Sequence, residues 1–236
     1  MIALNSPLLR LPAGLDRKQG LFFDGMRHAA EVAELSYSRL RGVLTAIALD
    51  EPTRPVESTT RVAAFLDAWA FVDAVDRYRQ LDLLLPNAKP REERDGLEDF
   101  LQATKQIRDV RNVADHLASR ADHVVAQKGT ALGELRWLTL RSEKEGLSCA
   151  LIPGRMQDAT IGIVNPAGVQ IELPTDLIEL KAGEHVAGLS NTYRALLRRV
   201  RTLEEALVAN HEAQGVDLER DAAGADQVIR LVLAFS

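Results

Sequence analysis

The clearest structural signal in this chain is residues 60–85, TRVAAFLDAWAFVDAVDRYRQLDLLL. Apolar side chains recur there at intervals of three and four residues, the spacing that places them on one face of an α-helix. Ser58 or Thr59 could cap the start of this helix. The expected apolar face consists of Val62, Phe65, Leu66, Trp69, Val72, Val75, Leu81 and Leu84. This face predicts that the helix packs against other helices.

Three further stretches show helical spacing. A helix over residues 21–49 comes first, and the Asp-Glu-Pro triplet at 50–52 ends it. The Pro-Asn-Ala-Lys-Pro run at 86–90 breaks the chain, and a kinked helical stretch over 91–127 follows. A last long helix is expected over 191–213. Two helical hairpins would bury the apolar faces of these helices.

The interval between apolar residues shortens after residue 129. Glycine and proline punctuate short apolar runs, which is typical of strands joined by tight turns. The expected strands cover residues 135–140, 147–152, 160–164 and 169–173. They predict a small antiparallel sheet. For residues 228–235 the pattern fits a closing strand and a short helix equally well.

The sequence therefore predicts an α+β protein, mainly a helical bundle, with a small antiparallel sheet inserted before a long C-terminal helix. We expect an N-terminal arm over residues 1–18 and the bundle over 19–128. The β-rich part covers 129–190. Residues 191–236 hold the last helix and a closing segment that packs on the bundle or the sheet.

Composition sets limits on the class of protein. The 236 residues are 46% hydrophobic and 27% charged, which is typical of a soluble globular chain. The net charge is −5, so contact with nucleic acid needs a local basic patch. Cys149 is the only cysteine, which excludes an internal disulfide and a zinc site built on thiolates. With no apolar run of ~18 residues and no signal peptide, a cytoplasmic location is expected, without membrane contact.

The chemistry-bearing motif is Arg111-Asn112-Val113-Ala114-Asp115-His116. An arginine can hold a phosphate group and a histidine can transfer protons near neutral pH. On an unbroken helix Arg111 and His116 point about 140° apart, whereas Asn112 and His116 share a face. A site would need a helix break near Asn112 or a second copy of the chain. Alternatively, Arg111 pairs with Asp115 and His116 is simply solvated.

Other motifs give weaker signals. Asp115-His116 and Asp122-His123 repeat at an interval of seven residues, but ~10 Å along a helix is too far for two imidazoles to share one metal ion. No glycine-rich phosphate loop and no serine-hydrolase motif occurs. We therefore expect no metal and no cofactor.

A basic strip is expected on the last helix. Arg194, Arg198 and Arg201 lie on one helical face, where they could contact the phosphates of a substrate. Alternatively, these arginines pair with Glu204, Glu205 and other acids on a solvated face.

The helical part resembles the HEPN superfamily (higher eukaryotes and prokaryotes nucleotide-binding), in particular its uncharacterised bacterial members. The resemblance covers about residues 25–127. It rests on Asp67-Ala68-Trp69, Val72-Asp73, Asp76-Arg77-Tyr78-Arg79, a Leu-Pro break, the run from Ile107 to Asn112, and His116-Leu117.

The resemblance implies a helical bundle that forms a homodimer, and a metal-independent endoribonuclease of a toxin–antitoxin or phage-defence system. His116 would act as general acid and base, Arg111 would stabilise the phosphate in the transition state, and Asn112 would orient the site. Paired copies would bring two motifs together. RNA and an antitoxin or other protein are then the expected partners. The alternative is a non-catalytic helical scaffold that binds a nucleotide, RNA or a protein.

Overall fold

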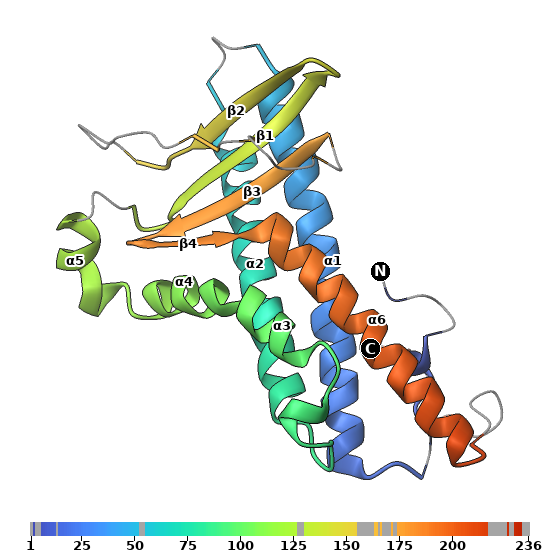
Figure 1. Ribbon diagram of the computed structural model, residues 1–236. Helices are drawn as coiled ribbons and strands as arrows, with labels where there is room; N and C mark the ends of the chain where they lie inside the picture. Colours follow the sequence, from blue (N-terminus) through green and yellow to red (C-terminus); the bar gives the residue numbers. More distant parts are fainter. Residues whose placement is uncertain are drawn as a thin grey trace.

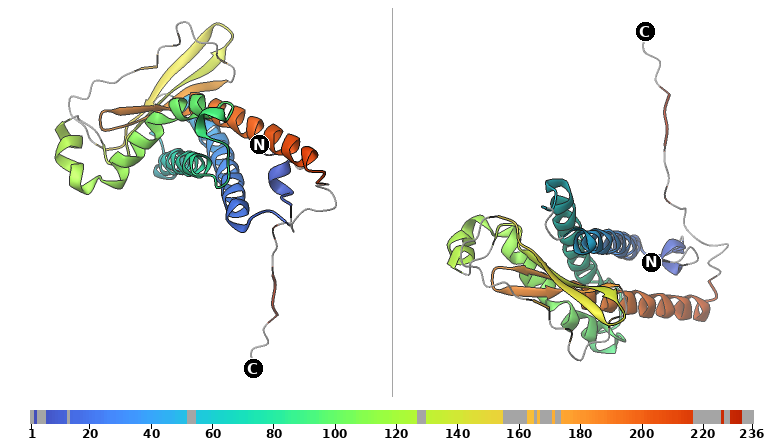
Figure 2. Two further views of the ribbon diagram at one scale, coloured as in Figure 1. Left: turned by 60° about the horizontal axis from the view of Figure 1, so that its bottom comes forward. Right: turned by 90° about the horizontal axis from the view of Figure 1, so that it is seen from above.

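The computed structural model describes residues 2, 6–12, 14–51, 55–126, 130–154, 163–164, 166, 171, 174–216, 226 and 229–232. Within these residues the chain forms six α-helices and a four-stranded antiparallel sheet. The expected α+β class is confirmed. Figure 1 shows the sheet lying across one end of a long helical hairpin, and Figure 2 shows the same layers from two further directions.

The hairpin consists of α1 (Arg17–Leu49) and α2 (Ser58–Leu83), which run antiparallel. Asp16 caps α1, since its side chain accepts a hydrogen bond from the backbone N–H of Gln19 at 3.0 Å. Alanine and aromatic residues dominate the buried side of α2: Ala64, Phe65, Ala68, Phe71, Val72, Ala74, Val75 and Tyr78. The small alanines let the two helix backbones approach closely.

The expected apolar face of α2 is partly wrong. Phe65, Val72 and Val75 are buried as predicted, but Val62, Leu66 and Leu84 are 54%, 61% and 64% exposed. Most sides of α2 carry apolar residues, so the spacing alone does not determine which sector packs inside. Trp69 is half-buried, and its Nε1–H donates to the carbonyl oxygen of Leu132 at 3.0 Å.

The predicted kinked stretch 91–127 is divided into short elements. These are a 3₁₀ turn (Arg91–Glu93), α3 (Leu97–Ala103), α4 (Lys105–Asp115), a second 3₁₀ turn (Ala118–Arg120) and α5 (Ala121–Ala126). Buried Thr104 separates α3 from α4, and its hydroxyl donates to the carbonyl oxygen of Phe100 at 2.7 Å. The backbone N–H of Thr104 donates to the same carbonyl oxygen at 3.0 Å, so both donors of Thr104 close the last turn of α3.

The sheet has the strand order β2-β1-β3-β4, with every neighbouring pair antiparallel. Strands β1 (Glu134–Ser142) and β2 (Glu145–Leu151) agree with the first two predicted strands. Strands β3 (Thr175–Ala182) and β4 (His185–Gly188) were not predicted.

The other two predicted strands, 160–164 and 169–173, are not supported. Ile163, Val164 and Ile171 are in no strand, and the rest of both ranges lies outside the described residues. The sequence did not indicate β3 because it is buried along most of its length and yet carries Asp176, Glu179 and Lys181. That composition gives neither alternation nor a continuous apolar run.

The last helix, α6 (Leu189–Ala213), follows β4 directly and starts two residues before the predicted Asn191. It packs against β3, α3 and α1, and so joins the sheet to the bundle. Of the undecided segment 228–235, residues 229–232 form neither helix nor strand, and the other residues lie outside the described ones. No helix in the described part of the chain is both long and apolar enough to cross a membrane.

Candidate functional site

Arg111 is held against α2 by carboxylates. Its Nη1 donates to Asp76 Oδ2 at 2.5 Å, and its Nε lies 2.8 Å from Asp73 Oδ1 and 3.7 Å from Asp115 Oδ2. Burial lowers the pKa of the guanidinium, but the bond to Asp76 and the charges of Asp73 and Asp115 outweigh burial and raise it. The pairing with Asp115 was the alternative expectation. Because its charge is already compensated, Arg111 is a weak phosphate ligand in the single chain.

Asn112 and His116 lie on a different side of α4 from Arg111. The helix runs unbroken through Asn112 to Asp115, and His116 is its C-terminal cap. Five residues at ~100° each place His116 about 140° from Arg111, whereas Asn112 and His116 share an exposed face. The structure therefore does not bring Arg111 and His116 together within one chain.

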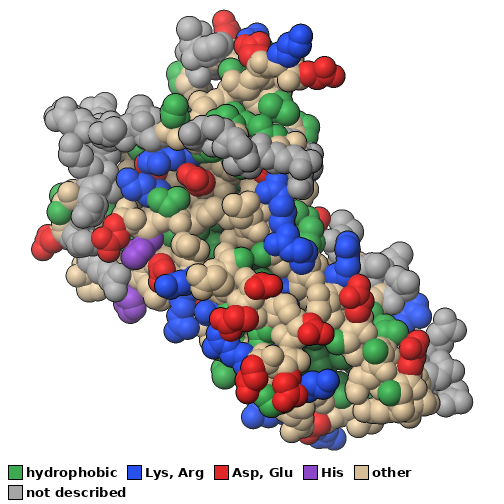
Figure 3. Space-filling model, viewed as in Figure 1, with side chains coloured by type: hydrophobic (Ala, Val, Ile, Leu, Met, Phe, Trp, Pro, Cys, Tyr) green, Lys and Arg blue, Asp and Glu red, His purple; other side chains and the backbone are tan. Residues whose placement is uncertain are grey.

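The exposed face of α4 continues past these two residues. It carries Lys105, Arg108, Asn112 and His116, whose side chains form no hydrogen bond or ion pair within the described part of the chain. Figure 3 shows lysine and arginine side chains gathered over α4, with histidine side chains at the end of this group. We call these four residues the α4 face.

Arg79 of α2 lies near the α4 face and was not predicted as a site residue. Its Nε and Nη1 are buried and have no hydrogen-bond partner among the described residues. Burial lowers its pKa, and the positive charges of Arg108 and Arg91 lower it further, while Asp76 and Asp109 act in the opposite direction. The guanidinium is therefore placed near two other cations without an acceptor for two of its nitrogens.

The basic strip on α6 is only partly available to bind phosphate. Arg194 donates through Nη2 to Asp176, which is fully buried, and through Nη1 to Asn191 Oδ1 at 3.3 Å. Arg198 and Arg201 are exposed, and neither side chain pairs with any residue that the structure describes. Arg194 thus pairs with an acid, as the alternative expected, but that acid is Asp176. Among the described residues Glu204 and Glu205 pair with none of the three arginines, and Glu204 accepts a hydrogen bond from Ser6. Arg194 is therefore a structural residue as well as a candidate phosphate ligand.

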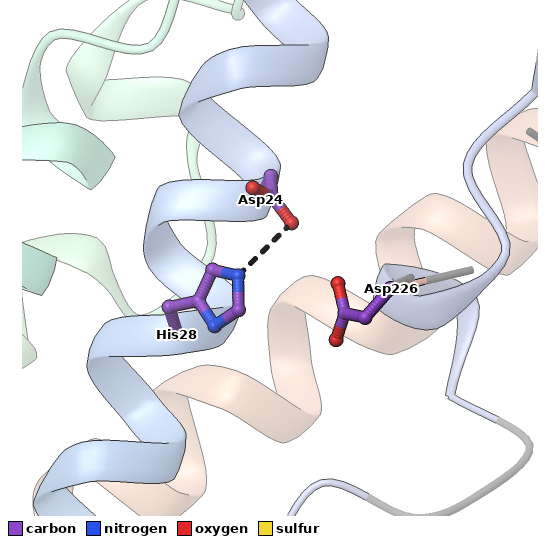
Figure 4. Close-up of side chains that lie close together, drawn as sticks. All are labelled: Asp24, His28 and Asp226. Atoms are coloured by element: carbon purple, nitrogen blue, oxygen red, sulfur yellow. Dashed lines mark ion pairs between the residues drawn. The ribbon is translucent and has the colours of Figure 1, made fainter. Parts of the chain in front are cut away.

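A cluster of possible metal ligands lies on α1. Ligand atoms of Asp24, His28 and Asp226 lie within 4.8 Å of one another, and Figure 4 shows the imidazole of His28 turned to Asp24. Arg27 compensates the negative charge, because its Nη2 lies 2.8 Å from Asp24 Oδ1 and 2.9 Å from Asp226 Oδ1. The cluster thus already surrounds a cation. The second Asp-His doublet of the sequence is Asp122-His123, and the side chain of His123 lies outside the described residues.

A groove of about 1060 Å³ runs between the end of α1 and strand β2. Its lining includes Cys149 together with the acidic side chains of Asp50, Glu51 and Glu57. Burial raises the pKa of the Cys149 thiol, which disfavours the reactive thiolate. Arg141 lines the groove as well, so its charge is mixed and no ligand is assigned to it.

Comparisons with protein-family models, with curated proteins and with solved structures find no match to this chain.

Proposed function

We propose that the protein is a HEPN-like RNA-binding protein that holds single-stranded RNA on the α4 face. The observation that carries this proposal is a set of side chains on one exposed side of α4, Lys105, Arg108, Asn112 and His116, which pair with no residue that the structure describes. The resemblance of the helical part to the HEPN superfamily also supports it. Arg198 and Arg201 are further candidate contacts.

The chemistry of these side chains suits RNA. Lys105 and Arg108 supply two positive charges for phosphate groups, and Arg108 can hold two phosphate oxygens at once. Asn112 can donate and accept hydrogen bonds at base edges, and His116 can bond to a 2′-hydroxyl. The face extends about 16 Å along α4, which is long enough for several nucleotides at ~3.4 Å each. With a net charge of −5, binding depends on this local patch and weakens with salt.

Replacing Lys105 and Arg108 together with glutamine is expected to weaken RNA binding. Each lost phosphate contact lowers the slope of log K against log salt by about 0.7, so the double variant should lose roughly 1.4 from that slope. Fluorescence anisotropy of a labelled single-stranded RNA, titrated at several salt concentrations, measures both affinity and slope.

The matched control is Lys144→Gln, which removes an exposed charge in the turn between β1 and β2. It should leave affinity and slope at the wild-type values. If Lys105→Gln/Arg108→Gln bound RNA as tightly as this control, the α4 face would not be the RNA-binding surface.

A second candidate function is the metal-independent endoribonuclease of a toxin–antitoxin or phage-defence system. The exposed pair Asn112 and His116 supports it, since a general acid and base must reach the substrate. Because Arg111 lies on another side of α4, the site would need an arginine from the second copy in a homodimer. An antitoxin would be a further partner.

Cleavage is tested with purified protein and mixed RNA in EDTA. If the chain is a nuclease of this type, wild type leaves 2′,3′-cyclic phosphate ends, and His116→Ala loses cleavage without losing its fold, since an exposed side chain contributes little packing. RNA binding without cleavage by the wild-type homodimer would leave the binding function and exclude the catalytic one.

A further inference from the structure

Arg79 is in an unfavourable environment. Two of its guanidinium nitrogens are buried without an acceptor among the residues that the structure describes, although a buried charge is ordinarily paired and hydrogen-bonded. Burial and the neighbouring cations Arg91 and Arg108 act together to lower its pKa. The attraction of Asp76 and Asp109 opposes these effects without outweighing them, so the positive charge of Arg79 costs the folded chain some stability.

Other buried arginines of the chain differ in this respect. Arg199 is 4% exposed, and its Nε and Nη2 donate to Asp82 at 2.6 and 3.0 Å. Arg27 is equally buried and has three carboxylate partners. The carboxylate that acts most strongly on Arg79 is that of Asp76, whose Oδ2 is already bonded to Arg111. The remaining oxygen, Oδ1, is buried and has no hydrogen-bond partner among the described residues.

We propose that Arg79 is a phosphate ligand of the α4 face and turns outward to join Arg108 when a phosphate group binds there. This inference rests on the proposed RNA-binding function and adds a residue to its site. The outward turn breaks no hydrogen bond of Nε or Nη1 to any described residue, because neither atom has such a partner. Phosphate oxygens would supply the missing acceptors and would compensate the repulsion between Arg79 and Arg108.

The proposal predicts opposite changes in stability and in binding. Arg79→Met keeps the length of the side chain and removes its charge, so the midpoint of thermal unfolding without RNA should rise. The same variant should bind single-stranded RNA about tenfold more weakly, as expected for one lost charge-assisted hydrogen bond. The slope of log K against log salt should fall by about 0.7.

The control is Arg77→Met, on the same helix and about 160° away around its axis. Arg77 is exposed, so its replacement should change neither midpoint nor affinity. Arg79→Gln is measured in parallel as a second uncharged variant. A rise in the midpoint together with weaker binding in both Arg79 variants supports the proposal.

Two other outcomes overturn it. A lower midpoint in both Arg79→Met and Arg79→Gln would make Arg79 a structural residue. Unchanged affinity in both, while Lys105→Gln/Arg108→Gln loses RNA, would exclude Arg79 from the site and leave the proposed function intact. If the double variant also bound RNA normally, the proposed function would fail first, and with it this inference.

Discussion

Replacing Asp82 with alanine is expected to lower the free energy of unfolding by about 3–5 kcal/mol. Asp82 is fully buried in α2 and accepts hydrogen bonds from two arginines. Arg199 of α6 is bonded through both Nε and Nη2, and Arg94 donates through its own Nη2. Without the carboxylate, both guanidinium groups would lose their buried acceptor, and the charge of Asp95 would compensate Arg199 only in part.

The cluster also connects segments that are distant in sequence. Arg94 precedes α3, Arg199 lies on α6, and Nη1 of Arg199 donates to the carbonyl oxygen of Asp95 at 2.6 Å. Asp82 therefore fixes the start of α3 and the middle of α6 to the end of α2. Its loss should affect all three contacts, which is why we place this effect at the upper end of single substitutions.

Chemical denaturation of Asp82→Ala beside wild type measures the loss. The control is Asp73→Ala on the same helix, which removes a 53% exposed partner of Arg111 and should cost at most ~1 kcal/mol. If the two variants lost the same free energy of unfolding, the buried ion pairs of Asp82 would contribute no more to stability than the exposed ion pair of Asp73.

The helices were predictable because long apolar periods are a strong local signal. The stretches 21–49, 60–85 and 191–213 each correspond to one helix of the structure, with ends that differ by at most a few residues. The strands β3 and β4 were not predictable, because their place is determined by partners that are distant in sequence. Thr175, for example, bonds through its hydroxyl to Thr45 of α1 and to Thr139 of β1.

In the candidate site, too, the local features were predictable and the contacts between distant segments were not. The sequence placed Asn112 and His116 on one helical face, and it identified the pairing of Arg111 with Asp115 as an alternative to a catalytic role. It did not indicate that Asp73 and Asp76 of α2 would also contact Arg111. Arg79 was missed as well, because an unpaired buried guanidinium is a property of tertiary packing and leaves no periodic signal.

The second large effect is expected at Trp137. This side chain is fully buried in β1, opposite Cys149 of β2, and Trp137→Ala should lower the free energy of unfolding by about 3–5 kcal/mol. The apolar spacing of α2 predicted that Trp69 lies on the buried face of that helix, but Trp69 is half-buried. Trp69→Ala should therefore cost about 1–2 kcal/mol, which includes its hydrogen bond to Leu132.

Denaturant unfolding of both variants, with Trp137→Phe as a control that keeps most of the ring volume, separates the two tryptophans. Trp137→Phe should lose less than Trp137→Ala, because a smaller cavity forfeits fewer contacts. A larger loss for Trp69→Ala than for Trp137→Ala would reverse the order. The main core would then lie between α2 and the segment around Leu132, instead of between the sheet and the helices that cover it.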